Sequence, residues 1–584
     1  MAANDLQVDL KIFWHEVKFR SHKNDPILFT ENTQEINSCS ESKDNIFYFS
    51  DEKEKVMSKA KNIFFNLTSS VGHVEKNKTK FINATLNKTG TSDWWFHFLS
   101  CRFGNVHDIF NSLILLLTID KIAKKTKVSR IILYGAPDDI INVLKSKWDV
   151  LCIGPIQKSP KKTFLIIKSL LSRVKFVFNT FYKSFAARLY SSKKLSNYDI
   201  AFFAFFDWSI NVNKNGDVID KYLGNTKSTL LKENLRCCTL ALLDHNNSAT
   251  SKRQSVFSAA QKASKGNDVH ILQKELSFMD LVKEFFNFNI FISTINYKNE
   301  FKKNLCCEGY SVYHLFKRHL IQYSLDSSIP HLKMIELAVQ RLTKKHKIRL
   351  GISFLECYPF TKAVKLGMLK GNKNSKLAVS QHAPKGDNTL FFLNSSLHDN
   401  GDVHGVDNMP KADYFLAMGK HSLKHARSYG FNKNNIHLTG SPRFDGLIIN
   451  KINRPQYDPS KSFRILYLAS GNLSAEVKAL DLVAKAIAAL KKTNKVVFNV
   501  REHPHFPVKE NISPLCKNCI SSYDPPALAL DYMSANLVIY SDSTAGAEAL
   551  IAGADVWSVV TNHPSTVLKE LRSVGKVFNN SNNL

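Results

Sequence analysis

The segment KVVFNVREHP, residues 495–504, holds a short apolar run that is closed by polar residues. A second segment of the same kind, LVIYSDSTAGAEAL, covers residues 537–550. Short, β-branched apolar runs of this sort are typical of the buried strands of a parallel sheet. Polar groups just past the carboxyl ends of such strands project into the crevice where open α/β sheets bind ligands. The two segments therefore predict an α/β fold with a ligand site at this edge of the sheet.

The polar part of the second segment precedes a good helix-forming run. Ser541, Ser543 and Thr544 stand at this junction. The first turn of a helix has unpaired backbone N–H groups and the positive end of the helix dipole, which suit a phosphate. The hydroxyls of Ser543 and Thr544 would either add donors or simply cap the helix. His503 and Arg501 follow the other strand, which we expect to be its neighbour, so two cationic groups and a helix start should face one crevice.

These motifs resemble a known group of enzymes. The His-Pro pair after a strand, followed by a Ser/Thr element that opens a helix, resembles the donor site of bacterial sialyltransferase-like and Kdo-transferase-like enzymes of the GT-B fold. Upstream, TGSPRFD at 439–445 resembles a motif of capsule-linked transferases and CDP-glycerol glycerophosphotransferases. The likeness to bacterial surface carbohydrate (capsule or lipopolysaccharide) biosynthesis proteins covers about 198–560. It implies two Rossmann-like domains that face each other across a cleft, with Arg443 among the substrate-binding residues.

Strand-like and helical stretches alternate regularly after Asp199, which predicts a doubly wound parallel sheet. We expect its strands at 200–206, 236–243, 290–295, 348–355, 376–380, 412–417 and 435–438, and a second series from 463–469 onward. The expected domains are an N-terminal extension over 1–92, a Rossmann-like acceptor domain over 93–449 and a Rossmann-like donor domain over 450–584.

Composition limits the class of protein. With 584 residues, of which 44% are hydrophobic, the chain can form more than one core. No apolar run is long enough to cross a bilayer and the start lacks a signal-peptide pattern, so we expect a cytoplasmic protein. Ten cysteines do not make a disulfide scaffold at this length, and Cys516-x-x-Cys519 has no second pair to complete a zinc site. No Asp-x-Asp pair follows a strand, so the predicted reaction needs neither metal nor cofactor.

The formal net charge of +30 calls for an anionic partner or for a compositional bias towards Lys and Asn. No nucleic-acid-binding motif is present, which leaves anionic lipid and anionic sugar nucleotides. Residues 160–194 place apolar side chains at helical spacing among Lys and Arg, without an acidic residue between Asp149 and Asp199. This insertion is expected to be an amphipathic helix that either packs on the sheet or lies peripherally in the anionic inner face of the cytoplasmic membrane.

Sugar transfer from a nucleotide needs a stabilised leaving phosphate. We assign this task to His503 and the Ser543/Thr544 helix start, with Arg501 as a helper. The turn at Ser470 and Gly471 is a second possible phosphate cradle. By analogy with related GT-B enzymes Glu548 would grip the ribose hydroxyls, although a Glu in a first helical turn is also favoured by the dipole alone.

The acceptor hydroxyl needs a base, expected on the larger domain. Glu356, His382 and Asp207 each follow a buried strand, and Glu356 is the first choice. The family pattern has an acidic pair before a Gly, whereas the nearest match here, Asp399-Asn400-Gly401, carries Asn in the second place.

The resemblance implies a CMP-activated acidic sugar, of the Kdo or nonulosonic acid type, as the donor. A hydroxyl of a surface glycan or of its lipid-linked precursor would be the acceptor. A CDP-glycerol-type glycerophosphotransferase and a sugar-nucleotide epimerase are the enzyme alternatives. From another class, the chain would be a basic scaffold that binds lipid or nucleic acid.

Overall fold

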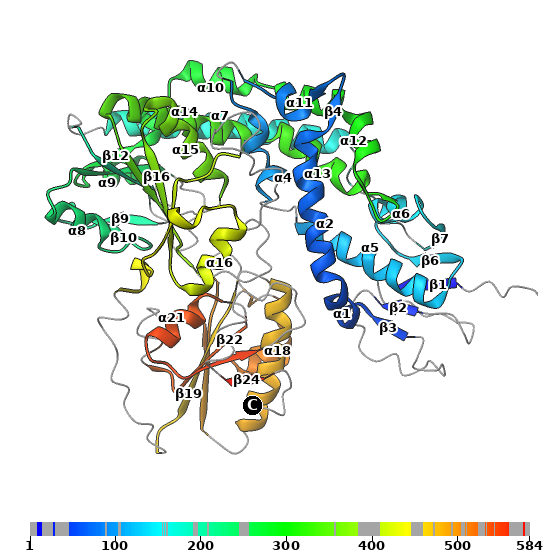
Figure 1. Cartoon of the computed structure of the whole chain (residues 1–584). Coiled ribbons are helices and arrows are strands. Elements are labelled where there is room, and N and C mark those ends of the chain that lie inside the picture. The colour runs from blue at the N-terminus through cyan, green and yellow to red at the C-terminus, as the bar shows by residue number, and fades with distance from the viewer. Residues whose placement is uncertain are drawn as a thin grey trace, which may run out of the picture.

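Figure 1 shows the computed structural model of the chain. The structure describes residues 9–13, 27–29, 46–87, 90–102, 107–154, 156, 158, 160, 162–190, 197–206, 209–243, 256–354, 358–383, 409–445, 460–470, 473–491, 495–503, 508–509, 511–523, 532, 534–541, 543–559 and 576–578.

The C-terminal sheet has the doubly wound order of a Rossmann fold. Its six strands, all parallel, are β19 (Phe463–Leu468), β20 (Val496–Arg501), β21 (Ser522–Tyr523), β22 (Leu537–Tyr540), β23 (Val556–Val559) and β24 (Lys576–Phe578). They are arranged as β21-β20-β19-β22-β23-β24. In chain order this is the 3-2-1-4-5-6 arrangement that binds nucleotides where the winding reverses.

The large sheet repeats this winding. Its parallel strands are β8 (Ile200–Phe206), β11 (Cys237–Leu243), β12 (Val269–Ile271), β15 (Leu350–Ser353), β16 (Lys376–Ser380), β17 (Tyr414–Ala417) and β18 (Ile436–Leu438). They lie in the order β12-β11-β8-β15-β16-β17-β18, and the hairpin β9 (Ile210–Val212) and β10 (Val218–Asp220) extends from the end of β8. The expected α/β class with two Rossmann-like sheets is confirmed.

A third, smaller sheet has the same winding. It consists of β1 (Asp9–Phe13), β2 (Ile27–Phe29), β3 (Ile46–Tyr48), β6 (Arg130–Tyr134) and β7 (Asp149–Ile153), in the order β3-β2-β1-β6-β7. Strand β1 pairs in parallel with β6, so residues on both sides of the expected boundary at 92 form one sheet. The sequence predicted only scattered strands before 92, because the three short strands there are separated by long polar stretches.

Helices cover these sheets (Figure 1). In the N-terminal part they are α1 (Phe49–Glu52), α2 (Glu54–His73), α3 (Phe81–Ala84), α4 (Phe98–Cys101), α5 (His107–Thr126) and α6 (Asp138–Leu144). Around the large sheet they are α7 (Lys162–Leu189), α8 (Thr226–Lys232), α9 (Val256–Ser264), α10 (Phe278–Phe285), α11 (Asn289–Asn296), α12 (Lys298–Asn304), α13 (Tyr313–Leu325), α14 (Ser328–His346), α15 (Pro359–Gly371) and α16 (Lys420–Ser428). The C-terminal sheet carries α18 (Leu473–Leu490), α19 (Pro514–Cys519) and α21 (Ala545–Ile551).

The buried apolar side chains form separate clusters. One cluster runs through both the small N-terminal sheet and the large sheet and includes Leu10, Phe64 and Phe203. The C-terminal sheet has its own cluster on each face, one around Tyr467 and one around Leu468. Successive residues of a strand point to opposite faces, so β19 contributes to both clusters. Among the described residues, the C-terminal sheet therefore shares neither of its clusters with another sheet.

One strand prediction is wrong. Residues 290–295 lie within α11 instead. The residues of this segment that are buried are Ile290, Ser293 and Thr294, a spacing that fits one face of a helix. The Thr294 hydroxyl donates to the Ile290 carbonyl at 2.8 Å, and that of Ser293 to the Ala84 carbonyl at 3.0 Å. Tertiary contacts to residues far away in the sequence thus override the β propensity of the isoleucines.

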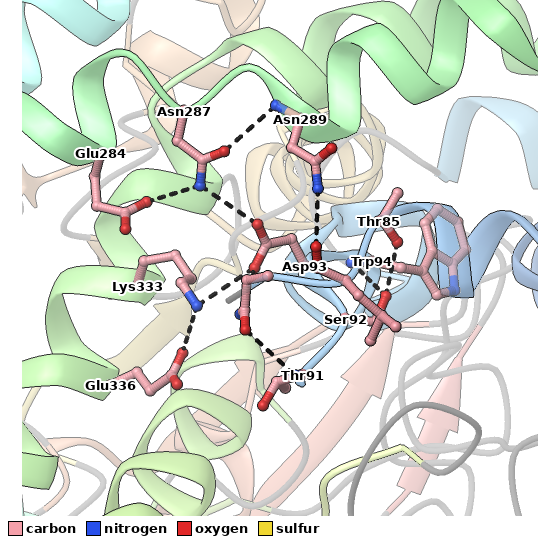
Figure 2. Close-up of polar contacts among 12 residues, drawn as sticks. Thr85, Thr91, Ser92, Asp93, Trp94, Glu284, Asn287, Asn289, Lys333 and Glu336 are labelled. Atoms are coloured by element: carbon pink, nitrogen blue, oxygen red, sulfur yellow. Dashed lines mark hydrogen bonds and ion pairs between the residues drawn. The ribbon is translucent and has the colours of Figure 1, made fainter. Parts of the chain in front are cut away.

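A buried polar cluster fastens the segment around Asp93 to the helices of the large sheet (Figure 2). The Asp93 carboxylate lies 3.4 Å from the Lys333 ammonium and accepts from Asn287 at 3.4 Å. Lys333 also donates to Glu336 at 3.1 Å, and Asn287 donates to Glu284 at 3.0 Å. Burial alone would lower the pKa of Lys333, but the surrounding carboxylates raise it above its usual value. The cluster therefore joins α10 and α14 to the N-terminal part through a largely buried ionic contact.

Within the described ranges, every helix is too short or too polar to span a lipid bilayer.

Candidate functional site

The winding of the C-terminal sheet reverses between β19 and β22. The chain passes from β19 to β20 on one side and later returns to β22 on the other. Ligands of doubly wound sheets bind outside the carboxyl ends of the strands at this point. The residues that follow these two strands are Ser470 on one side and Ser541, Ser543 and Thr544 on the other. The polar segment found in the sequence therefore lies at the reversal point.

Two of these serines bind a buried glutamate. Glu476, in the first turn of α18, is fully buried. It accepts hydrogen bonds from the hydroxyl of Ser541, from Ser470, and from the Tyr467 hydroxyl at 2.8 Å. Burial raises the pKa of Glu476, and its serine and tyrosine donors oppose that rise. In this structure Ser470 and Ser541 thus hold the start of α18 against the end of β22.

Ser543 and Thr544 form the start of α21. The Ser543 hydroxyl accepts from the Ala545 backbone N–H at 3.3 Å, and Thr544 makes no side-chain cap bond. The helix lies close on its strand at Gly546, where an added Cβ would be 2.6 Å from the Tyr540 ring. Glycine is therefore required at this position of α21 for the close approach of helix and strand.

Arg501 and His503 stand at the end of β20, on the far side of β19 from β22. Arg501 and Tyr540 both pair with Leu468 across the sheet, so the three residues lie at one level. The sequence suggested direct neighbours, whereas β19 separates the two strands by two strand spacings, roughly 10 Å. His503 is partly buried. All the strand ends lie at one edge of a parallel sheet, as the sequence predicted.

Arg443 connects the large sheet with the C-terminal sheet. It lies in a short 3-10 turn, Pro442–Phe444, after β18. Its Nη2 donates to the Oε1 of Glu548 in α21, and its Nη1 donates to the His382 carbonyl at 3.3 Å. The guanidinium also lies 5.2 Å from the centre of the Tyr222 ring, a cation–π contact. Glu548 and His382, which the sequence singled out separately, thus meet at the guanidinium of Arg443.

The glycine turn before α8 makes this meeting possible. Gly224 has a φ of +50°, and a Cβ there would lie 2.6 Å from the Pro442 carbonyl oxygen. The backbone of this turn therefore touches the Arg443 turn directly, which places Tyr222 under the guanidinium. The Tyr222 ring stacks on Phe354, with ring centres 4.5 Å apart and an angle of 13° between the planes.

The ring of His382 has a defined orientation. Its Nδ1 lies 2.9 Å from the Phe354 carbonyl oxygen, which can only accept, so Nδ1 carries a proton. In the neutral ring the lone pair is then on Nε2. Tyr222 and Phe354 meet the imidazole edge-on, with ring centres at 5.2 and 5.7 Å. A fixed tautomer with a basic Nε2 is the form that a general base requires.

Glu548 is buried and ion-paired. Burial raises the pKa of its carboxyl, and the charge and hydrogen bond of Arg443 oppose that rise. The carboxylate therefore depends on Arg443 for its charge and orientation. From the sequence we expected Glu548 to bind ribose hydroxyls, whereas its partner in the structure is the Arg443 guanidinium.

Several candidates lie outside the described residues. They are Asp207, Glu356, Gly471 and the segment 399–401. In the chain, Asp207 directly follows β8 and Glu356 comes shortly after β15, and these are the strands between which the winding of the large sheet reverses.

Two residues of the site, Tyr222 and Glu476, were not predicted from the sequence. Tyr222 comes from the hairpin region after β10, far in the chain from the residues that it contacts, and no local pattern marks it. Glu476 could have been found from the sequence. It lies in the first turn of a helix that follows a strand and a Ser, and an acidic residue in this position is typical of a helix cap.

In the part of the chain that the structure describes, no three side chains of His, Cys, Asp or Glu come together in a way that could hold a metal ion. Cys516 and Cys519 are buried beside α18, with their sulfurs 3.7 and 3.5 Å from the backbone oxygens of Leu480 and Ala484. Burial raises the pKa of the Cys516 thiol to about 12, so it stays protonated at neutral pH.

Comparison with known protein families and with curated proteins gave no match. Among solved structures, the UDP-GlcNAc 2-epimerase of Neisseria meningitidis bound to UDP-GlcNAc is 11% identical, with a TM-score of 0.37 over 66% of this chain and 89% of that one. The UDP-GlcNAc 2-epimerase of Methanocaldococcus jannaschii in complex with UDP-GlcNAc and UDP is 11% identical, with a TM-score of 0.36 over 65% and 89%. The wall teichoic acid polymerase TagF is 11% identical, with a TM-score of 0.31 over 73% and 88%. Similarity at this level transfers neither a substrate nor a residue role to this chain.

Proposed function

We propose that the chain is a glycosyltransferase of the GT-B type that moves an acidic sugar from a CMP-activated donor to a hydroxyl of a surface glycan or of its lipid-linked precursor. The observation that carries the proposal is the contact of Arg443 with Glu548 and with His382. It brings a cation of one doubly wound sheet to the carboxylate of the other, beside a histidine with an oriented ring. An acidic sugar nucleotide is an anion, which suits a donor site to which we assign Arg443, Arg501, His382 and His503.

In the proposed reaction, the bond between the anomeric carbon and the phosphate oxygen breaks, and its electron pair stays on the departing CMP. His503, Arg501 and the N–H groups at the start of α21 stabilise this charge. The arrangement at the reversal point supports this role, since Ser543 and Thr544 stand at the edge where doubly wound sheets bind nucleotides.

The acceptor oxygen forms the new bond to the anomeric carbon, and its proton passes to a base. His382 is proposed for this step because a protonated Nδ1 leaves the lone pair on Nε2. Glu356, the first choice from the sequence, remains a candidate for the same step. Activities of His382→Asn and Glu356→Gln distinguish the two, since loss of the true base lowers kcat by about 10²-fold or more.

A binding experiment tests the donor class. The purified chain is heated with CMP, CDP, UDP or GDP, and the shift in Tm is measured. A cytidine-nucleotide site predicts a rise with CMP and CDP and none with the other two. A rise with UDP alone would contradict the cytidine proposal.

A transfer experiment tests the chemistry. CMP release from CMP-Kdo and from a CMP-nonulosonic acid is measured with an acceptor glycan. We expect His503→Ala to lower kcat by about 10²- to 10³-fold and Arg443→Lys to lower kcat/KM by about tenfold. His437→Ala, at an exposed position of β18, and Arg427→Lys, on the exposed surface of α16, are the matched controls and should retain full activity.

The alternatives give other products. A glycerophosphotransferase would release CMP from CDP-glycerol, and an epimerase would convert a sugar nucleotide without releasing any nucleotide. A basic scaffold would show no nucleotide-dependent Tm shift, and its binding to polyanions would weaken steeply as salt rises.

A further inference from the structure

Helix α7 is long, and one face of it is apolar and exposed. The exposed large apolar side chains of this 28-residue helix are Phe164, Ile167, Leu171, Val174, Phe178, Phe181, Tyr182, Phe185 and Leu189. Leu171 is 64% exposed and Phe178 is 70% exposed. A helix that only packed on its sheet would bury such side chains and leave its charged ones in water. An apolar face of this extent marks an interaction site.

Helix α10 continues this face. Its Phe278 ring meets the ring of Phe181 edge-on, with centres 5.6 Å apart, and the next residue, Met279, is also exposed. The buried guanidinium of Arg173 in α7 donates at 3.0 Å to the backbone oxygens of Phe285 and Asn287. These bonds fix the end of α10 against the middle of α7. The two helices therefore present one continuous surface, which we call the α7–α10 face.

The exposed charges of the α7–α10 face are all basic. They are Lys162, Lys168, Lys175, Arg188 and Lys283. The acidic side chains of α10 are withdrawn from the surface, Asp280 into an ion pair with Arg341 at 2.6 Å and Glu284 into the cluster of Figure 2. Positive charge continues beneath α7, where Lys175 and Lys183 line a cavity of about 220 Å³. Exposed aromatic and aliphatic side chains interspersed with lysines fit an anionic lipid surface.

We propose that the α7–α10 face binds an anionic phospholipid bilayer, with the aromatic and aliphatic side chains in the interface and the lysines at the headgroups. In Figure 1 α7 and α10 lie at the opposite end of the molecule from the C-terminal sheet, so a bound membrane leaves that sheet in water. The surface acts independently of the transfer reaction. Charge complementarity favours lipid over a second copy of this chain, because two copies of the face would bring like charges together.

Flotation of the whole chain with vesicles tests the proposal. Vesicles of phosphatidylcholine with 30% phosphatidylglycerol are compared with vesicles of phosphatidylcholine alone. We expect binding to the anionic vesicles only, weakened by salt. Lys168→Glu/Lys175→Glu should lower the partition coefficient at least about tenfold, since each basic residue at a membrane surface contributes about fivefold. Leu171→Gln/Phe178→Gln should lower it by a similar factor through loss of apolar insertion.

Matched controls use positions outside the face. Ile219→Gln, at a residue 55% exposed on β10, and Lys214→Glu, exposed in the turn before β10, should float as the unchanged chain does. Circular dichroism and Tm confirm that each variant is folded. The proposal is overturned if the face variants bind as strongly as the controls, or if the unchanged chain does not bind anionic vesicles. It is also overturned if light scattering shows a dimer that Leu171→Gln/Phe178→Gln dissociates and no vesicle binding occurs, since the face is then a self-interface.

Discussion

Arg443 and Glu548 form an ion pair in which the carboxylate is the more deeply buried partner. Replacing Arg443 with Gln leaves Glu548 without its cation, so the pKa of this carboxyl in the folded state rises further above its unfolded value. Protonation then favours the folded state. Arg443→Gln should therefore lower the free energy of unfolding only slightly near pH 4. Its effect should grow as pH rises above 4.5, the pKa of Glu548 in the unfolded chain.

Urea unfolding of Arg443→Gln at several pH values measures this effect. The double variant Arg443→Gln/Glu548→Gln has no charge left to bury and should recover most of the lost stability at pH 8. A double variant as unstable as Arg443→Gln at pH 8 would contradict the pairing.

His97 makes the folded state sensitive to acid. Its Nδ1 accepts from the Leu99 backbone N–H at 3.2 Å and caps α4, and burial lowers its pKa from 6.5 to about 3. A proton on Nδ1 would remove the cap. Between pH 6.5 and about 3, His97 is therefore protonated in the unfolded chain but not in the folded one. Stability is thus complete above pH 6.5 and is lost as pH falls, by about 2 kcal/mol at pH 5.

Asparagine at position 97 retains an acceptor for the cap but does not titrate. Unfolding free energies of His97→Asn should therefore depend less on pH between 7 and 5 than those of the unchanged chain. If the unfolding free energy depended on pH equally in both proteins, His97 would be excluded as the source of the acid sensitivity. Burial also lowers the pKa of His270 and of His319, each to about 4, so a residual slope is expected in the variant.

At the scale of single residues, motifs predicted Arg443 and Glu548 because each follows a recognisable local pattern of strand, turn and helix. Their mutual contact was not predicted, since it joins residues from two sheets. Tyr222 was missed for the same reason.

Among the elements, α14 depends on the cluster around Asp93. Lys333→Met removes the ammonium that Asp93 and Glu336 share and leaves buried carboxylates without it. The expected loss is about 3–5 kcal/mol of unfolding free energy. Lys298→Met, at an exposed position of α12, should change stability by no more than about 0.5 kcal/mol. Denaturant titration of both variants checks the difference, and equal effects would show that the cluster is not held by charge.

Helix α21 depends on the lack of a side chain at Gly546. Gly546→Ala places a methyl group 2.6 Å from the Tyr540 ring, and overpacking of this kind costs about 1–3 kcal/mol. Gly419→Ala is the control, because a Cβ there meets no atom within 4 Å. Both variants are compared by thermal unfolding. If Gly546→Ala is as stable as the control, helix and strand are less closely packed than the structure indicates.

Strands with continuous apolar runs were predicted from the sequence nearly to the residue, as at β22. Short strands such as β1 and β2 lack long runs of this kind and owe their place to pairing, β1 with β6 and β2 with β1. In α11, a β-branched run became a helix because its buried positions follow a helical spacing. Local propensity therefore predicted the strands that are buried on both faces. It failed for segments whose secondary structure depends on contacts with residues far away in the sequence.

For the whole molecule, the separate core of the C-terminal sheet predicts two unfolding transitions in calorimetry. CMP should raise the temperature of one transition only, and Gly546→Ala should lower the same one. A single transition that both changes shift would show that the cores unfold as one unit. The alternation of strands and helices predicted this class of fold from the sequence. The order of strands within each sheet was not predicted, because it depends on pairings between distant segments.

The Arg443–Glu548 ion pair joins the large sheet to the C-terminal sheet through a single guanidinium. Separating the two sheets would break this contact and leave each charge without its partner. An anionic ligand that bound the Arg443 guanidinium would compete with Glu548 for it, so ligand binding and loss of this contact would be coupled.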